Sequence, residues 1–377
     1  MTAPGPPLVD WELASRTGVR LARPGPEISA AEARVAVADL RRCAVEARGH
    51  VRACTGLDAP AVDADVAVVD RSAWVRSGAL GMRHLLEPLQ DRLGEHGRAA
   101  RTPAGVRAVT ARVAGLELGA GLAFLSGKVL GQYELFPAQG PDADRPGRPL
   151  LVAPNVVQVE RELDVVPADF RLWVCLHEET HRVQFGAVPW LRGYLVEQVG
   201  ELVVGLDAES EHLGERAGAA LAAVSAALRG VPGQSLAEAL QSPEQAARIA
   251  VITALMSLLE GHADVVMDEV GPEVVPTVAA IRARFQRRRE QPGRVDAAIR
   301  RLLGFDAKLK QYADGARFVR GVVDRVGMDG FNHVWSSAAT LPTTAELADP
   351  DAWVTRVHPD RQDRQDRQDR PEGTELP

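Results

Sequence analysis

The stretch 172–185 reads L-W-V-C-L-H-E-E-T-H-R-V-Q-F and holds His177, Glu178 and His181 in the spacing His-Glu-x-x-His. Its flanks are apolar and it contains no proline or glycine, so it predicts a helix. Residues four apart on a helix lie on one face, and the two imidazoles can therefore bind one metal ion. Glu178 lies about 100° round the helix, where its longer side chain reaches a water on that metal. The pattern predicts a catalytic zinc site.

The third protein ligand is the harder inference, because a catalytic zinc ion keeps three protein ligands and one open position. Gln184 and Ala187 stand where a metzincin would need a glycine and a histidine, which excludes that pattern. Two residues remain as lesser candidates. Glu201 lies twenty residues after His181, and His262 lies further along the chain.

Glu260 is the preferred third ligand, within the apolar segment L-L-E-G-H-A-D-V-V. Asp264 follows it by four residues, so both carboxylates share one helix face. We expect Glu260 to bind the metal and Asp264 to accept the free ring N–H of His177 or His181, as carboxylates do beside zinc-bound histidines. The alternative is that the two carboxylates form ordinary ion pairs with arginines.

His262 and Tyr312 are candidates for stabilising the oxyanion that forms during hydrolysis. His262 projects from a different side of its helix than Glu260, and it either donates to an oxyanion or fills the core. Tyr312 lies in K-L-K-Q-Y-A-D-G. It either polarises a carbonyl or packs its ring in the protein with the hydroxyl facing solvent.

The composition is that of an ordinary globular chain. Of 377 residues, 46% are hydrophobic and 25% charged, which is enough to bury a sizeable core. The net charge of −7 argues against a nucleic-acid partner. Three cysteines and no signal-peptide pattern indicate a reducing compartment, and no apolar run reaches about 18 residues. We therefore expect a cytoplasmic protein without membrane insertion.

The rest of the chain predicts a mainly α-helical fold with a small β-sheet. Ser29 to Glu32 reads S-A-A-E, a capping box that opens a helix ending at Gly56. The glycines of residues 104–131 complete neither a phosphate-binding loop nor a dinucleotide fingerprint, so no nucleotide cofactor is expected.

Two predicted strands, 132–136 and 150–157, come shortly before the metal helix. Pro154 suits an edge position in such a sheet, because an edge residue does not need its N–H for pairing. By analogy with zinc peptidases, we expect a sheet edge that can pair with an extended substrate.

Four segments together resemble the zincin-like metallopeptidases, a family associated with deazaflavin coenzyme biosynthesis. They read H-E-E-T-H-R-V-Q-F-G-A-V-P-W-L-R, L-L-E-G-H-A-D-V-V-M-D, Y-A-D-G-A-R-F-V-R-G-V-V-D-R-V-G and L-P-T-T-A-E-L-A-D-P. The resemblance runs in order from about Val9 to Val357. It implies a zincin-like metallopeptidase fold, with the active-site helix between two lobes, and a zinc hydrolase of unspecified substrate. Nothing in the sequence resembles a deazaflavin site.

We expect one zincin-like domain over residues 1–357, with an N-terminal lobe of about 1–185 and a helical C-terminal lobe of about 186–357. The end of the chain, 358–377, contains repeated D-R-Q without apolar residues to form a core. That composition predicts a disordered tail.

Together these expectations predict a zinc-dependent hydrolase that cleaves a peptide or a small amide. His177, His181 and Glu260 would hold Zn²⁺, and Glu178 would act as general base. The main alternative is a non-catalytic zincin scaffold that binds a partner or assists coenzyme metabolism, with zinc as a structural ion.

Overall fold

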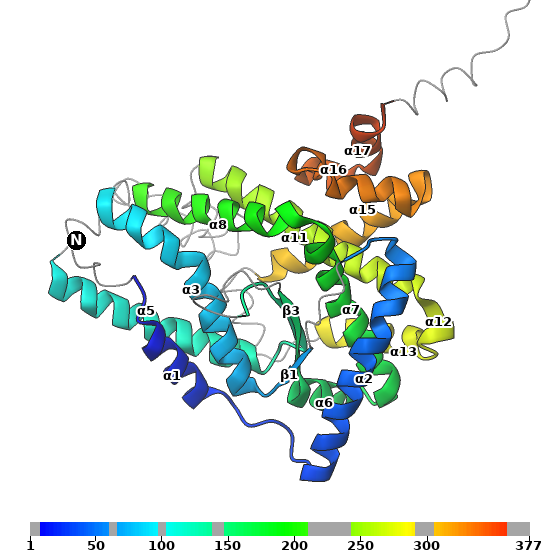
Figure 1. Ribbon diagram of the computed structural model, residues 1–377, viewed down its shortest axis with the longest axis horizontal. Helices are drawn as coiled ribbons and strands as arrows, with labels where there is room; N and C mark the ends of the chain where they lie inside the picture. Colours follow the sequence, from blue (N-terminus) through cyan, green and yellow to red (C-terminus); the bar gives the residue numbers. More distant parts are fainter. Residues whose placement is uncertain are drawn as a thin grey trace, which may run out of the picture.

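The computed structural model describes residues 8–59, 66–96, 103–137, 147–209, 243–290 and 305–359. The tail from 360 onward, for which disorder is predicted, lies outside the described residues. Helices dominate, as expected (Figure 1). They are α1 (Trp11–Leu21), α2 (Ala30–Thr55), α3 (Arg71–His96), α5 (Ala104–Ser126), α6 (Ala153–Glu162), α7 (Pro167–Ala187), α8 (Pro189–Glu209), α11 (Pro243–Glu269), α12 (Gly271–Val274), α13 (Val278–Glu290), α15 (Phe305–Phe331), α16 (Thr344–Ala348) and α17 (Pro350–Val357), with 3-10 turns at Asn332–Trp335 and Ala338–Thr340.

A small sheet joins β1 (Ala67–Val69), β2 (Gly131–Glu134) and β3 (Arg148–Val152) in the order β1-β3-β2. The central strand, β3, runs parallel to β1 and antiparallel to β2. Its residues alternate between the two faces of the sheet, as the pleat requires. Leu150 and Val152 pack with α3 and α5, whereas Leu151 packs with α2 and α7. The sheet is therefore covered by helices on both faces (Figure 1).

The second predicted strand was too long. It ends at Val152, and α6 begins at Ala153 with Pro154 in its first turn. A proline at that place has a preset φ and lacks only an N–H that would have no partner inside the helix. Pro154 is therefore a helix-start residue and not a strand-edge residue. The edge beside the metal helix is formed by β2.

The predicted start and stop of α2 are confirmed. Ser29 Oγ accepts a hydrogen bond from the Glu32 N–H at 3.2 Å, and the Glu32 carboxylate accepts one from the Ser29 N–H at 2.8 Å. Gly56 ends the helix in the left-handed conformation, with φ of 63°.

Helix α7 runs through the core and carries the His-Glu-x-x-His spacing. One face packs on α2, where the Cys175 thiol donates to the Leu40 carbonyl at 3.6 Å. Cys175 is thus a core residue, as expected, and Cys43 and Cys54 are also free thiols. The opposite face of α7 meets α11. This arrangement buries most of α7 while leaving one strip near the surface.

Helix α11 is held against α15 by two glycines. A Cβ atom at Gly261 would lie 2.5 Å from the Ala316 backbone N, and one at Gly315 would lie 2.7 Å from the Ser257 carbonyl carbon. Real Cβ atoms do not approach so closely, so the crossing requires glycine at both positions. Glu260 immediately precedes Gly261, so the crossing fixes the part of α11 from which Glu260 projects.

Two of the described helices, α5 and α11, are long and apolar enough to cross a membrane by length and composition alone. Most of α11 is a core helix, because it is packed between α7 and α15. A core helix passes the same test, so the absence of membrane insertion stays a prediction, as does the division into two lobes.

Candidate metal centre

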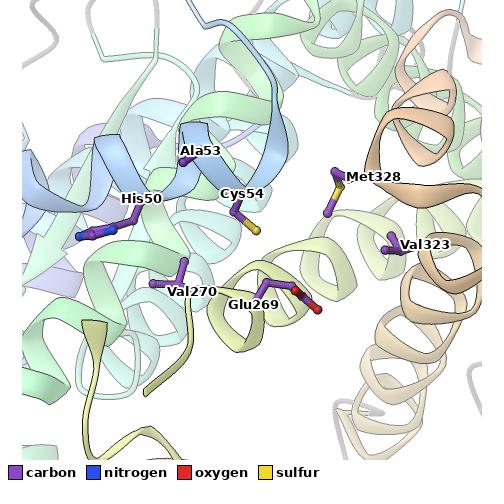
Figure 2. A pocket seen from close by; sticks show the side chains of 7 residues that line it. All are labelled: His50, Ala53, Cys54, Glu269, Val270, Val323 and Met328. Atoms are coloured by element: carbon purple, nitrogen blue, oxygen red, sulfur yellow. The ribbon is translucent and has the colours of Figure 1, made fainter. Parts of the chain in front are cut away.

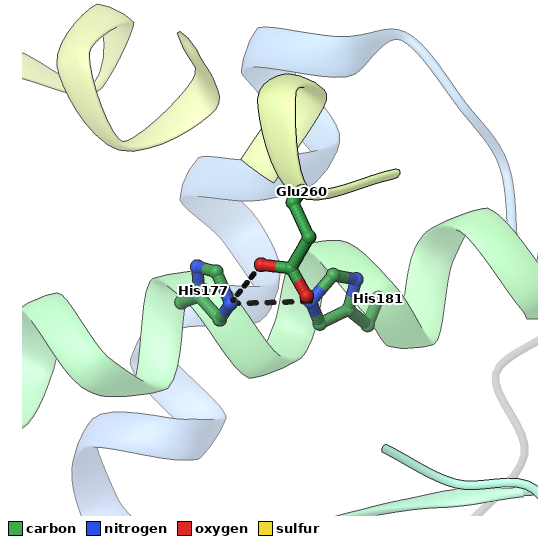
Figure 3. A group of neighbouring side chains, drawn as sticks. All are labelled: His177, His181 and Glu260. Carbon is green, nitrogen blue, oxygen red and sulfur yellow. Dashed lines mark hydrogen bonds and ion pairs between the residues drawn. The ribbon is translucent and has the colours of Figure 1, made fainter. Parts of the chain in front are cut away.

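Three side chains from helices α7 and α11 converge where α7 is partly exposed (Figure 3). His177 and His181 point the same way, and Glu260 reaches them from α11. The two Nε2 atoms lie 3.2 Å apart, and the Glu260 carboxylate oxygens lie 3.4 Å from His177 Nε2 and 3.9 Å from His181 Nε2. One ligand atom from each residue falls within 4.8 Å of the others. The structure therefore groups both predicted histidines with the preferred third residue.

This donor set fits a divalent metal ion. Two imidazole nitrogens and one carboxylate oxygen are the protein ligands of a catalytic zinc ion, which keeps a further position open. The side chains of His177 and Glu260 are 25% and 26% exposed, so the group is reachable from solvent. The donor set and its exposure indicate an open metal site, although they do not identify the metal.

The pKa values of the two histidines are shifted in opposite directions. Burial alone would lower the pKa of His177, but the hydrogen bond and charge of Glu260 outweigh it and raise that pKa to about 9. Burial and the neighbouring His177 lower the pKa of His181. One positive charge therefore rests on His177, at the place where a metal ion would lie.

Glu178 lies beside this group and is almost fully buried. Burial raises its pKa to about 7, and its Oε2 atom has no hydrogen-bond partner among the described residues. The start of β2 covers it, since a Cβ atom at Gly131 would lie only 2.6 Å from Glu178 Cγ. A buried carboxylate with a pKa near neutrality and an unused oxygen has the properties of a general base.

Gln184 is the site residue that sequence reasoning missed. Its Oε1 atom accepts from His181 Nδ1 at 2.9 Å, and its Nε2 atom lies 2.9 Å from the Leu259 carbonyl and 3.0 Å from His262 Nδ1. It lies three residues after His181, on the same helix face, which is the signal that could have revealed it.

The expected role of Asp264, accepting a ring N–H of His177 or His181, stays a prediction. The hydrogen-bond position on the His181 ring is taken by Gln184, and no described hydrogen bond joins the Asp264 carboxylate to either histidine. Its negative charge raises the pKa of both rings as a lesser contribution. Its main-chain carbonyl accepts from Arg282 at 2.8 Å.

His262 lies in the core. It is 0% exposed, and its ring packs against Phe331 and Trp335. Burial lowers its pKa to about 3, with the charge of His181 adding to the effect. This burial favours the core alternative, and the oxyanion role of His262 stays a prediction.

The remaining candidates lie elsewhere. Glu201, on α8, forms an ion pair with Arg248 and is not part of the ligand group. Tyr312 lies in α15, but its side chain falls outside the described part of the structure. Its proposed role stays a prediction.

A separate cavity of about 340 Å³ lies between α2, the end of α11 and α15 (Figure 2). Its lining includes His50 and Cys54 of α2, Glu269 of α11 and Met328 of α15. Burial, with the charge of Glu269, raises the pKa of Cys54 to about 11. This thiol keeps its proton at neutral pH and is therefore a poor nucleophile.

Comparison with known proteins agrees with this geometry. A model of the zincin-like metallopeptidases matches residues 9–354. The chain belongs to this family. A crystal structure of a candidate hydrolase with a novel fold, from Chloroflexus aurantiacus, is similar to this zincin-like chain with a TM-score of 0.64. The two are 27% identical, over 93% of this chain and 98% of that one. No curated protein matches the sequence.

Proposed function

We propose that this protein is a zinc-dependent metallopeptidase or amidase. The observation that carries the proposal is the convergence of His177, His181 and Glu260 on one point, with the buried carboxylate of Glu178 beside it. Membership in the zincin-like family supports the same chemistry. The three converging residues would hold the ion. Zinc supplies a Lewis acid that polarises the scissile carbonyl and lowers the pKa of a water molecule.

Glu178 would take a proton from the attacking water and return it to the leaving nitrogen. Its pKa of about 7 suits both directions of transfer, because neither protonation state is strongly favoured at neutral pH. The backbone at Gly131 packs closely against the Glu178 side chain. The base is therefore fixed by packing rather than by a hydrogen bond to its second oxygen.

The sheet edge favours an extended peptide as the substrate. Within the described residues β2 pairs with β3 alone, so its outer side is available for strand addition. The strand begins at Gly131, directly over Glu178. An extended chain bound along β2 would therefore pass close to the base and the metal ligands.

The test compares Glu178→Gln with Glu201→Gln, the same isosteric change outside the site. Wild type and both variants are assayed for zinc content and for turnover of peptide and small-amide libraries. We expect Glu178→Gln to keep its zinc and to lose on the order of 10²–10⁴-fold in kcat. Full activity of Glu178→Gln would contradict the mechanism. Zinc in all three proteins without turnover would favour the scaffold alternative, including an accessory role in deazaflavin coenzyme metabolism.

A further inference from the structure

The Gln184 side chain is 0% exposed and links the two helices that carry the metal ligands. It starts on α7 and reaches the Leu259 carbonyl of α11, one residue before Glu260. A fully buried amide must satisfy its hydrogen-bonding groups inside the protein. Each of its polar atoms has a described partner.

The Leu259 carbonyl decides which way this amide points. A main-chain carbonyl oxygen only accepts, so the Gln184 atom facing it at 2.9 Å is the donating Nε2. The acceptor Oε1 then faces His181 Nδ1, and that nitrogen must carry the ring proton. His181 Nε2 consequently presents a lone pair to the metal site. The reversed amide would set two acceptor oxygens against each other.

His262 completes the arrangement from the other side. The amide nitrogen has two hydrogens, one for Leu259 and one for His262 Nδ1 at 3.0 Å. His262 Nδ1 is therefore an acceptor, and its ring is held between Phe331 and Trp335. The aromatic contacts prevent the imidazole from rotating away, and this keeps Gln184 in one orientation.

We propose that Gln184 is a positioning residue of the metal centre. It fixes His181 in its Nδ1–H tautomer and holds in place the part of α11 that carries Glu260. The carbonyl of Leu259 and the ring of His262 set its direction. The metal-binding part of this inference rests on the proposed function, whereas the tautomer does not. The amide is a neutral partner, so it orients His181 without adding negative charge to the site.

Two substitutions separate the orienting of His181 by Gln184 from the contribution of Gln184 to packing. Gln184→Met keeps the volume but removes the acceptor, and we expect metal affinity to fall by about 10–100-fold, as when such partners are lost from zinc sites. Gln184→Glu keeps an acceptor for His181 but removes both donors. We expect it to recover most of the metal affinity of wild type while unfolding more easily, because the Leu259 carbonyl is left unsatisfied. A purely structural role would make affinity follow stability in both variants.

Thr180→Val is the matched control. Thr180 is also fully buried on α7, and its hydroxyl donates to the Leu176 carbonyl at 2.8 Å within the same helix. Its loss removes a buried hydrogen bond without touching a metal ligand. We expect lower stability with unchanged zinc affinity.

The readouts are zinc affinity, by competition with a chelator, and ¹⁵N NMR of the His181 ring in metal-free protein. The expected result is a protonated Nδ1 in wild type and Gln184→Glu, and a mixture of tautomers in Gln184→Met. A protonated Nε2 in neutral wild-type His181 would overturn the inference. So would a Gln184→Met protein with the wild-type tautomer and affinity. If wild type binds no zinc but shows the expected tautomers, the proposed function and the metal-binding part of the inference fail, and only the assignment of the His181 tautomer to Gln184 stands.

Discussion

Helix α7 carries two polar clusters that are built in opposite ways. The arginine cluster joins Arg171, near the start of the helix, to Glu160 and Asp39. Arg171 donates to both oxygens of Glu160, at 3.0 and 2.7 Å, and to Asp39 at 2.8 Å. The histidine cluster, His177, His181 and Glu260, lies one to three turns later.

The two clusters differ in how their polar groups are paired. In the arginine cluster a planar guanidinium meets carboxylates in the fork geometry that it prefers, and the charges are paired within the protein. In the histidine cluster two ring nitrogens face each other at 3.2 Å, and Glu260 has raised the pKa of His177 to about 9. The first cluster pairs opposite charges of the protein, whereas the second brings two imidazole nitrogens and a carboxylate oxygen to one point, as a metal ion requires. We infer that the first stabilises the fold and the second binds a metal.

The largest expected effect on stability belongs to the arginine cluster. Arg171→Met leaves Glu160 buried without its positive partner, and we expect a loss of about 3–5 kcal/mol in the free energy of unfolding. Denaturant unfolding measures it. The control is Arg248→Met, which breaks the more exposed pair with Glu201 and should cost less than about 1 kcal/mol. Equal effects of the two substitutions would contradict a stabilising role for the arginine cluster.

The histidine cluster should stabilise the protein only when metal is present. At a free zinc concentration of about 100 times Kd, the free energy of unfolding should rise by about 2.7 kcal/mol in wild type. His181→Ala should abolish that rise, while Arg171→Met should keep it. Thermal unfolding with and without zinc measures the difference. A zinc response in His181→Ala equal to that of wild type would remove the distinction between the clusters.

Gly131→Ala tests whether the base is positioned by packing. The new Cβ atom would collide with Glu178, and a displacement of about 1 Å can cost on the order of 10²-fold in rate. Zinc stabilisation should be unchanged, because the three atoms nearest to the new Cβ belong to Glu178 and not to a metal ligand. Gly121, in α5, has no atom within 4 Å of its built Cβ, so Gly121→Ala is the matched control and should be neutral or slightly stabilising. Unchanged turnover in Gly131→Ala would show that Glu178 needs no such support.

The smallest expected effect is a pH dependence confined to the histidine cluster. The pKa of His177 is about 9 in the folded protein, above its ordinary 6.5. The bound proton therefore stabilises the metal-free protein fully below pH 6.5, and this contribution is lost as pH rises through 9. Because His177 is partly exposed, we expect a loss on the order of 1 kcal/mol. His177→Gln should not show this loss between pH 6.5 and 9, and an identical profile in that variant would contradict it.

The sequence was sufficient where the relevant geometry is local. His177 and His181 share a face because of the helical repeat, and the capping box of α2 depends on four consecutive residues. Glu260 could be inferred because a carboxylate in an apolar helix needs a partner. Each of these inferences uses only residue type and spacing within one element.

The sequence was insufficient where two elements meet. The spacing on α7 places Gln184 beside His181, but its link to α11 is visible only once Leu259 and His262 are known to lie against it. Asp264 shares a face with Glu260, yet the His181 ring is hydrogen-bonded to the uncharged amide of Gln184. The end of β3 at Val152 likewise depends on packing against two layers of helices, which the apolar run continuing to residue 157 conceals.

The most direct measurement is the zinc content of purified wild type beside Glu260→Ala and Glu201→Ala, prepared without chelator. We predict about one zinc ion per chain in wild type and in Glu201→Ala, and its loss in Glu260→Ala. That result would establish both the site and its third ligand. Zinc-free wild type, or loss of zinc only in Glu201→Ala, would contradict the metal centre described above.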